Sequence, residues 1–402
     1  MAQDGRTVGH GVIPRSPPLA RAAARNLTVS KVREVANAGF GVDGLAKFWF
    51  GEGDEPTPAF IREAAMDALA RGCTFYTHNR GSGELREALR QYLESWHGRP
   101  FDPESLSITS GGVSALMIAM QAIIDPGDEV VAVTPVWPNL AEIPLILGAR
   151  VTRVGLAPRN GRWRLDLDQL LATITADTRL VLLNSPNNPT GWVLPPEDRA
   201  PLLAHCRRLG VWLLTDDVYE RLAFDSQGES QSFLTLADPD DRLISANSFS
   251  KAWRMTGWRL GWLVAPPSIE AEIGKLLEYN TSCPPDFLQA GARAALGQAE
   301  PYIAGLRADF AGKRDRLLGA LSDVPGIEAT RPDGGMYVLF RVAGEGDCVD
   351  LAKRLITEAG LGLAPGGAFG LEAAGWLRWC FATSDAAMDE GLERLRAWMG
   401  AR

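Results

Sequence analysis

The sequence predicts an α/β protein with a large domain built on a mainly parallel sheet, covered by helices on both faces, and a smaller α+β domain. Short apolar runs alternate with helical stretches between about residues 105 and 265, which is typical of such a sheet. After about residue 300 this alternation gives way to a long helical stretch and separate strands. The chain has 402 residues, 46% of them hydrophobic, enough for two or three domains.

The predicted large domain contains a strand at Leu106–Thr109, a helix at Val113–Ile124 and a last strand at Leu260–Ala265. Ligands of a parallel sheet bind at the carboxyl ends of its strands, and the polar motifs of this chain follow directly after such runs. The other predicted elements are strands at Glu129–Val133, Val151–Val154, Arg179–Asn184, Val211–Thr215 and Arg242–Ala246, and a helix at Glu197–Leu209.

The C-terminal part is predicted to form the smaller domain, over residues 301–402, with residues 61–300 in the large one. Helices and strands there lack the regular alternation, which is typical of an α+β unit. The predicted elements are a helix at Pro301–Leu321, a strand at Tyr337–Phe340, a helix at Cys348–Ala359, a glycine-rich loop at Pro365–Gly370, a strand at Leu377–Phe381 and a final helix.

Composition narrows the possible functions. A net charge of −8 and a pI near 5.3 argue against nucleic-acid and anionic-membrane binding. No apolar run approaches the ~18 residues of a membrane-spanning helix. The four histidines have no metal-ligand spacing, and we expect no metal site. The cysteines are scattered and odd in number, which predicts reduced thiols in the cytoplasm: Cys73, Cys206, Cys283, Cys348 and Cys380.

The N-terminus is basic but lacks the apolar core of a secretory signal. An organelle transit peptide is one interpretation, and the one we prefer is a loose arm that packs on a partner subunit. The basic residues are Arg6, Arg15, Arg21, Arg25, Lys31 and Arg33, against Asp4 and Glu34.

The most informative segment runs from Ser248 to Trp262 and contains Lys251 between two short apolar runs. Ser248 and Ser250 precede the lysine, and Arg259 follows it. An amine can form an imine with an aldehyde cofactor, while hydroxyls and a guanidinium can hold its phosphate. A surface lysine beside a buried strand is the plain alternative. The segment closely resembles the pyridoxal-phosphate (PLP) lysine region of class I and II aminotransferases.

Two further motifs extend the resemblance and predict contacts to the cofactor ring. In Thr215-Asp216-Asp217-Val218-Tyr219, the resemblance places Asp216 at the pyridine nitrogen and Tyr219 at the ring hydroxyl, with Asp217 where the family has glutamate. In the turn from Asn184 to Gly191, it places Asn188 at the phenolic oxygen. Taken alone, Asp216 could simply cap a turn, and the second motif could simply be a loop.

The resemblance also implies a phosphate site and a stacking side chain. A glycine turn opens the helix near Gly112 and Val113, whose amides would join Ser248, Ser250 and Arg259 around the phosphate. Trp137 would stack on the ring, although a core tryptophan is the alternative. Tyr76 would reach the phosphate of the neighbouring subunit in a homodimer with shared active sites.

The amino-acid substrate is assigned to Gly51, Trp137, Asn188 and Arg378. Arg378 stands in an apolar strand, and its planar guanidinium suits the substrate carboxylate, with an internal ion pair as the alternative. Gly51 opens the segment that resembles the family's Gly-Glu-Pro-Asp loop, with Gly53 in place of proline. Aspartate-using relatives often have lysine where Val113 stands, so an aromatic or apolar amino acid becomes plausible.

The resemblance covers about residue 40 to the C-terminus and implies the PLP-dependent transferase fold type I, with residues 1–60 as an arm and part of the small domain. It implies amino-group transfer from an L-amino acid to a 2-oxo acid by a ping-pong mechanism through a Lys251 Schiff base. A β-eliminating C–S lyase, or another enzyme of the same carbanion chemistry, is the alternative. A PLP-binding sensor is a third reading, weakened by the acidic charge and the short segment before the first motif.

Overall fold

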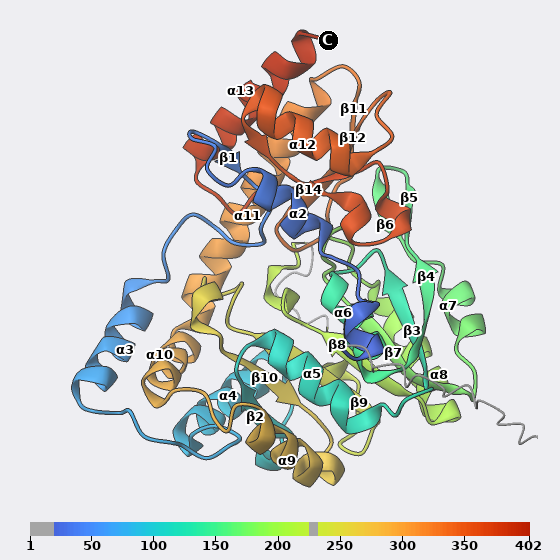
Figure 1. Ribbon diagram of the computed structural model, residues 1–402. Helices are drawn as coiled ribbons and strands as arrows, with labels where there is room; N and C mark the ends of the chain where they lie inside the picture. Colours follow the sequence, from blue (N-terminus) through green and yellow to red (C-terminus); the bar gives the residue numbers. More distant parts are fainter. Residues whose placement is uncertain (1–19, 225–231) are drawn as a thin grey trace, which may run out of the picture.

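A computed structural model describes residues 20–224 and 232–402. Arg6 and Arg15, in the predicted N-terminal arm, lie outside the described residues. Figure 1 shows the C-terminal elements stacked at one end of the molecule, with the long helix α11 (Ala299–Ser322) leading away from the central sheet. Over the described ranges, no helix is long and apolar enough to cross a membrane.

The central sheet has seven strands and is mainly parallel, as predicted. Only β10 runs antiparallel to its two neighbours, β2 and β9. A parallel sheet is buried on both faces, which explains why its strands read as nearly continuous apolar runs. In spatial order the strands are β2 (Leu106–Thr109), β10 (Gly261–Val264), β9 (Leu243–Ser248), β8 (Trp212–Asp216), β7 (Thr178–Asn184), β3 (Glu129–Thr134) and β4 (Arg150–Gly155).

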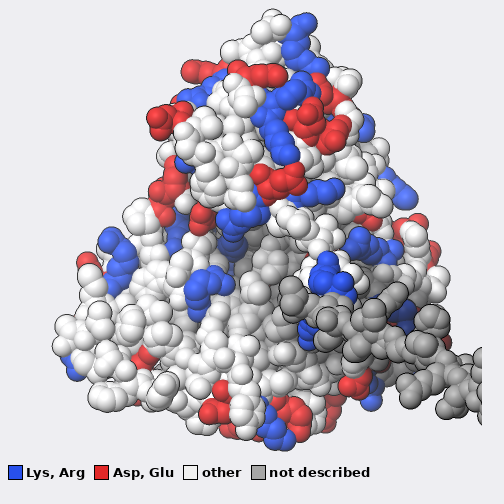
Figure 2. All heavy atoms as spheres, viewed as in Figure 1, with Lys and Arg blue, Asp and Glu red and all other residues white. Residues whose placement is uncertain are grey.

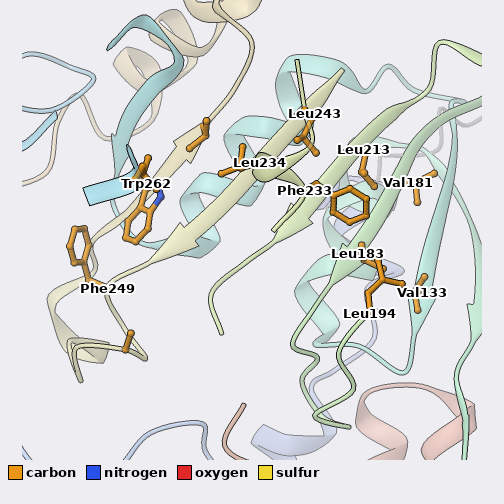
Figure 3. Close-up of a cluster of buried hydrophobic side chains, with 14 of the residues drawn as sticks. Val133, Val181, Leu183, Leu194, Leu213, Phe233, Leu234, Leu243, Phe249 and Trp262 are labelled. Carbon is orange, nitrogen blue, oxygen red and sulfur yellow. The ribbon is translucent and has the colours of Figure 1, made fainter. Parts of the chain in front are cut away.

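Alternate residues of these strands enter two different cores, one on each face of the sheet. On β3, Val131 and Val133 belong to one core, while Val130 and Ala132 belong to the other. Figure 3 shows part of the first core, with Leu183 on β7, Leu213 on the adjacent β8 and Trp262 on β10. Its helices are α3 (Ala59–Ala70), α4 (Gly83–His97), α7 (Leu167–Thr173), α8 (Pro196–Leu209), α10 (Asp286–Gly297) and the start of α11. The second core is closed by α5 (Gly112–Ile123), α6 (Pro138–Leu147) and α9 (Glu270–Asn280).

A third core lies in the C-terminal region, where a four-stranded antiparallel sheet packs with helices. N-terminal elements belong to this region, because β1 (Ala46–Lys47) pairs with β13 (Leu361–Gly362) and α2 (Lys31–Ala38) adds Val35 and Ala36 to the core. The domain boundaries at residues 60 and 300 stay a prediction. The other elements here are β11 (Ile327–Ala329), β12 (Tyr337–Val342), β14 (Ala364–Pro365), β15 (Leu377–Cys380), α12 (Cys348–Ala359) and α13 (Asp385–Gly400).

Two small elements complete the fold: α1 (Ala22–Arg25), which contacts α6, and the hairpin of β5 (Ala157–Arg159) with β6 (Arg162–Arg164). Figure 2 shows acidic and basic side chains intermixed over the viewed face.

Candidate active site

The predicted site residues meet at the carboxyl ends of β7, β8 and β9, around a cavity of about 470 Å³. The parallel pairing aligns these strand ends, with Asn184 opposite Asp216 and Asp216 opposite Ala246. Twelve of the thirteen predicted residues line the cavity: Gly51, Gly112, Val113, Trp137, Asn188, Asp216, Tyr219, Ser248, Ser250, Lys251, Arg259 and Arg378.

Tyr76 is the exception. It lies in the segment between α3 and α4 and is 90% exposed, next to Phe75, which is 83% exposed. A tyrosine so exposed cannot contribute to the cavity of its own chain, so its predicted role across an interface stays a prediction.

Lys251 reaches into the cavity, where its Nζ donates a hydrogen bond to the carbonyl oxygen of Gly51. Burial lowers the pKa of the lysine to about 8, so the neutral, nucleophilic amine is accessible near physiological pH. The close approach requires glycine at position 51, because a Cβ there would overlap the Tyr337 hydroxyl and lie 3.5 Å from Lys251 Nζ.

Asp216 is the last residue of β8 and is 5% exposed. Its Oδ1 accepts a bond of 3.3 Å from the backbone N–H of Val218, so it also braces the turn, as the alternative reading proposed. Burial, with a smaller contribution from the charge of Asp217, raises the pKa of Asp216 to about 7, while the bond from Val218 and the charge of Lys251 oppose the rise. A cation beside this carboxylate would favour its ionised form, and a protonated pyridine nitrogen is such a cation.

Asn188 and Tyr219 are fixed by buried hydrogen bonds. The Asn184 side chain accepts from the Asn188 N–H at 2.8 Å, and Asn188 Oδ1 accepts from Arg378 at 2.7 Å. That leaves the Asn188 NH2 group as the donor available to a ligand. The Tyr219 hydroxyl lies 2.7 Å from that of Tyr337, and burial raises the pKa of Tyr219 well above its usual value.

One end of the cavity has the features of a phosphate site. Helix α5 begins there without a side-chain cap, so its first backbone N–H groups are open to a ligand. Gly111 has a φ of 95°, and a Cβ there would overlap the Arg259 guanidinium. Ser248 Oγ donates to Ser250 Oγ at 2.8 Å, so the two hydroxyls act as one unit. Amides, hydroxyls and a guanidinium form a donor set that suits a dianionic phosphate.

Arg378 has the environment of a carboxylate site. It is 3% exposed, and its guanidinium lies 4.3 Å from the ring centre of Tyr337 and 4.7 Å from that of Phe369. Its Nη atoms donate to Asn188 and to the carbonyl oxygen of Trp49. Its buried Nε has no hydrogen-bond partner within the described part of the chain. These partners are neutral, unlike the internal ion pair that was the alternative, and the Nε is left for a ligand.

Gly53 stands where the family has proline, and the packing of the loop that begins at Gly51 explains the glycine. A Cβ at Gly53 would lie 2.6 Å from the carbonyl oxygen of Ala382, just beyond β15. The loop therefore packs its backbone directly against the end of the strand that carries Arg378.

Sequence reasoning missed the residues that close the mouth of the cavity. Tyr337, from β12, and Phe369 enclose Arg378, and α2 contributes Arg33, whose guanidinium lies 4.9 Å from the Phe50 ring centre. The further missed lining residues are Ser30, Val32, Leu116, Pro138, Asn139 and Val218. One signal was available for α2, because Ser30 caps its N-terminus by accepting from the Arg33 N–H.

The whole arrangement fits PLP: an amine for its aldehyde, a buried acid for its ring nitrogen, two donors for its ring oxygen and a cradle for its phosphate. Lys251, Asp216, Tyr219 and Arg259 would hold the cofactor, which leaves Arg378 for the substrate.

Comparison with known proteins shows the family of this chain. The family model "Aminotransferase class I and II" matches residues 47–395. An aspartate aminotransferase of Rhizobium meliloti is 34% identical over 86% of this chain and 87% of its own. An arginine–pyruvate transaminase of Pseudomonas aeruginosa is 35% identical over 82% and 83%.

The fold agrees as well. The solved aspartate aminotransferase from Rhizobium meliloti superposes with a TM-score of 0.87 and 30% identity, over 96% of this chain and 99% of that one. The predicted fold type I arrangement is thereby confirmed. The chain belongs to the class I and II aminotransferases, which use pyridoxal phosphate.

Proposed function

We propose that this aminotransferase holds PLP through Lys251 and binds its amino-acid substrate through Arg378. The observation that carries the proposal is the cavity itself, where a buried amine of lowered pKa faces a buried acid and a buried guanidinium with an open Nε. PLP, when bound, withdraws electrons from the substrate Cα and takes up the amino group.

Side chains of this chain bind the substrate and move its proton. Arg378 binds the substrate carboxylate with its planar fork, and the rings of Tyr337 and Phe369 pack against that fork. Lys251 Nζ, neutral above a pH of about 8, takes the proton from the substrate Cα. Asp216 would keep the ring nitrogen of the bound cofactor protonated, and the Tyr219 hydroxyl would donate to its ring oxygen.

Transfer and elimination differ in what a donor alone produces, so incubation with one amino acid tests the proposal. A transaminase releases one equivalent of 2-oxo acid per site and then stops until a 2-oxo acid is added. Steady release of ammonia from cystathionine would instead indicate a C–S lyase. The relatives described above are transaminases, so the lyase alternative is not favoured.

For the substrate side chain we propose an aromatic or other apolar donor. Val113 and Trp49 line the cavity, and neither can pair with a second carboxylate. Arg33, exposed at the mouth, is the group that would accommodate a polar end of a longer side chain. A profile of donors at saturating 2-oxo acid tests this: a strong preference for aspartate over phenylalanine and leucine would contradict it.

We also propose a homodimer with shared sites. Exposed aromatic side chains, Phe75 and Tyr76, are typical of a surface that another chain covers. Light scattering should give twice the chain mass, and Tyr76→Ala should weaken PLP binding without changing the fold. A monomer with full cofactor affinity would contradict this.

A cytoplasmic location completes the proposal. All five cysteines are free thiols, in keeping with a reducing compartment.

A further inference from the structure

A second buried acid lies directly behind Asp216. Asp217 is 3% exposed, and its backbone N–H donates to the Ala246 carbonyl at 2.8 Å, which fixes it to β9. It does not line the cavity, so it contacts neither cofactor nor substrate in the proposed reaction. A buried carboxylate is costly, so its presence one residue from the ring-nitrogen acid requires an explanation.

Three hydroxyl groups converge on one oxygen of this carboxylate. Oδ2 accepts from Ser245 at 2.6 Å, from Ser232 at 2.8 Å and from Thr215 at 3.1 Å. These donors come from β9, from the cap of the turn η3 (Phe233–Thr235) and from β8. Hydroxyl donors favour the ionised form of Asp217, because a carboxylate oxygen accepts hydrogen bonds more strongly than the oxygens of a neutral carboxyl group.

The charged surroundings come from several elements. Burial raises the pKa of Asp217, and the charge of Glu220 raises it further, while the three hydroxyls lower it. Burial lowers the pKa of His97 to about 4, so that ring is neutral at physiological pH. The titratable and charged groups around Asp217 are Asp216 at the end of β8, Glu220 and Arg221 after β8, His97 on α4, Arg99 after α4, and Lys251 on the cavity side.

We propose that Asp217 is a positioning residue that acts through Asp216, as a buried negative charge that raises the proton affinity of Asp216 and of the ring nitrogen it faces. The inference rests on the proposed role of Asp216. A negative charge in a protein interior raises the proton affinity of a neighbouring carboxylate, and the charge of Asp217 acts on Asp216 in this direction. The hydroxyl cluster keeps Asp217 ionised, so this effect persists at the working pH.

The test is nitrogen-15 NMR of the holoenzyme loaded with PLP labelled at its ring nitrogen, at one fixed, mildly alkaline pH. The nitrogen-15 frequency reports how far the proton has moved along the bond to Asp216. Asp217→Asn keeps the shape and removes the charge, so the signal should move part of the way toward its unprotonated position. Asp217→Ser, a second neutral variant that the hydroxyls can still bond, should move it the same way.

Two charged controls separate electrostatics from packing. Asp217→Glu keeps the negative charge. Ser232→Ala removes one hydrogen bond to Asp217 but leaves that charge in place. Both variants should therefore leave the nitrogen-15 signal at the wild-type position. A wild-type signal in both neutral variants would overturn the inference, as would a signal in Asp217→Glu displaced as far as in Asp217→Asn.

Asp216→Asn distinguishes this failure from a failure of the proposed function. That variant should produce the largest displacement of all. An unmoved signal there would refute the role of Asp216 and with it the inference, whereas a moved signal there with unmoved neutral variants at 217 refutes the inference alone.

Discussion

The floor of the cavity and its mouth are built in different ways. The floor consists of strand ends and the start of α5, and its side chains are buried and hydrogen-bonded to one another. The mouth consists of segments far apart in the chain, such as α2 and Phe369, and includes the exposed Arg33. We infer that the residues that carry out the chemistry lie where strand pairing fixes their positions. The residues that select the substrate lie where side chains can change without disturbing the sheet.

The largest effect is expected at the floor. Lys251→Ala removes both the anchor and the base, so turnover should fall by at least about 10⁴-fold. The fold should persist, because Lys251 faces a cavity rather than a core. Lys275→Ala, at an exposed lysine of α9, is the matched control and should retain full activity. Normal turnover in Lys251→Ala would show that Lys251 is not required for catalysis.

Arg378 lies between the floor and the mouth, and its replacement should weaken substrate binding while leaving cofactor binding intact. Arg378→Lys keeps the positive charge but loses the planar fork and one of its two hydrogen bonds to the carboxylate, so kcat/KM for any amino acid should fall roughly 10–10²-fold. The visible spectrum of the bound cofactor should barely change. Steady-state kinetics and absorbance together check this, and a loss of cofactor with little change in KM would place Arg378 in the floor instead.

The pH dependence of PLP capture by the apoprotein tests the floor without any substrate. Because burial lowers the pKa of Lys251 to about 8 from the usual 10.5, the amine becomes neutral and reactive as pH rises through about 8. Below that midpoint the capture rate should fall about 10-fold for each pH unit. Stopped-flow absorbance measures it, and a midpoint near 10 would show an amine that burial does not perturb.

The smallest effect is expected at Val113, in the first turn of α5, where the floor borders the space for the substrate side chain. Val113→Lys places a cation at the edge of the cavity, where solvent weakens an ion pair, so the ratio of aspartate to leucine kcat/KM should rise only about fivefold. Val113→Met, of similar length without charge, is the control. Loss of activity toward both donors would mean that Val113 supports the floor as well.

Most residues of the floor could be predicted from the sequence, whereas few residues of the mouth could be. Strand runs such as Val211–Thr215 were visible because both faces of a parallel sheet are apolar, and Asp216, Asn188 and Lys251 stand in local motifs. Tyr337 could not be found, because its meeting with Tyr219 depends on how the C-terminal sheet lies against the central one.

The antiparallel direction of β10 also escaped prediction. The residues that join β9 to β10 contain only a short 3₁₀ turn at Thr256–Trp258, and without a crossover helix the chain can return only beside β9 in the opposite direction. Lys251 and Arg259 both lie in this return, which brings them to the same end of the sheet.

The central claim is that one amine, that of Lys251, carries the cofactor. Borohydride reduction of the PLP-loaded protein, followed by peptide mass spectrometry, tests it most directly. The account predicts a single pyridoxyl adduct on the peptide that contains Lys251. An adduct on any other lysine, or no adduct from a protein that still transfers amino groups, would contradict it.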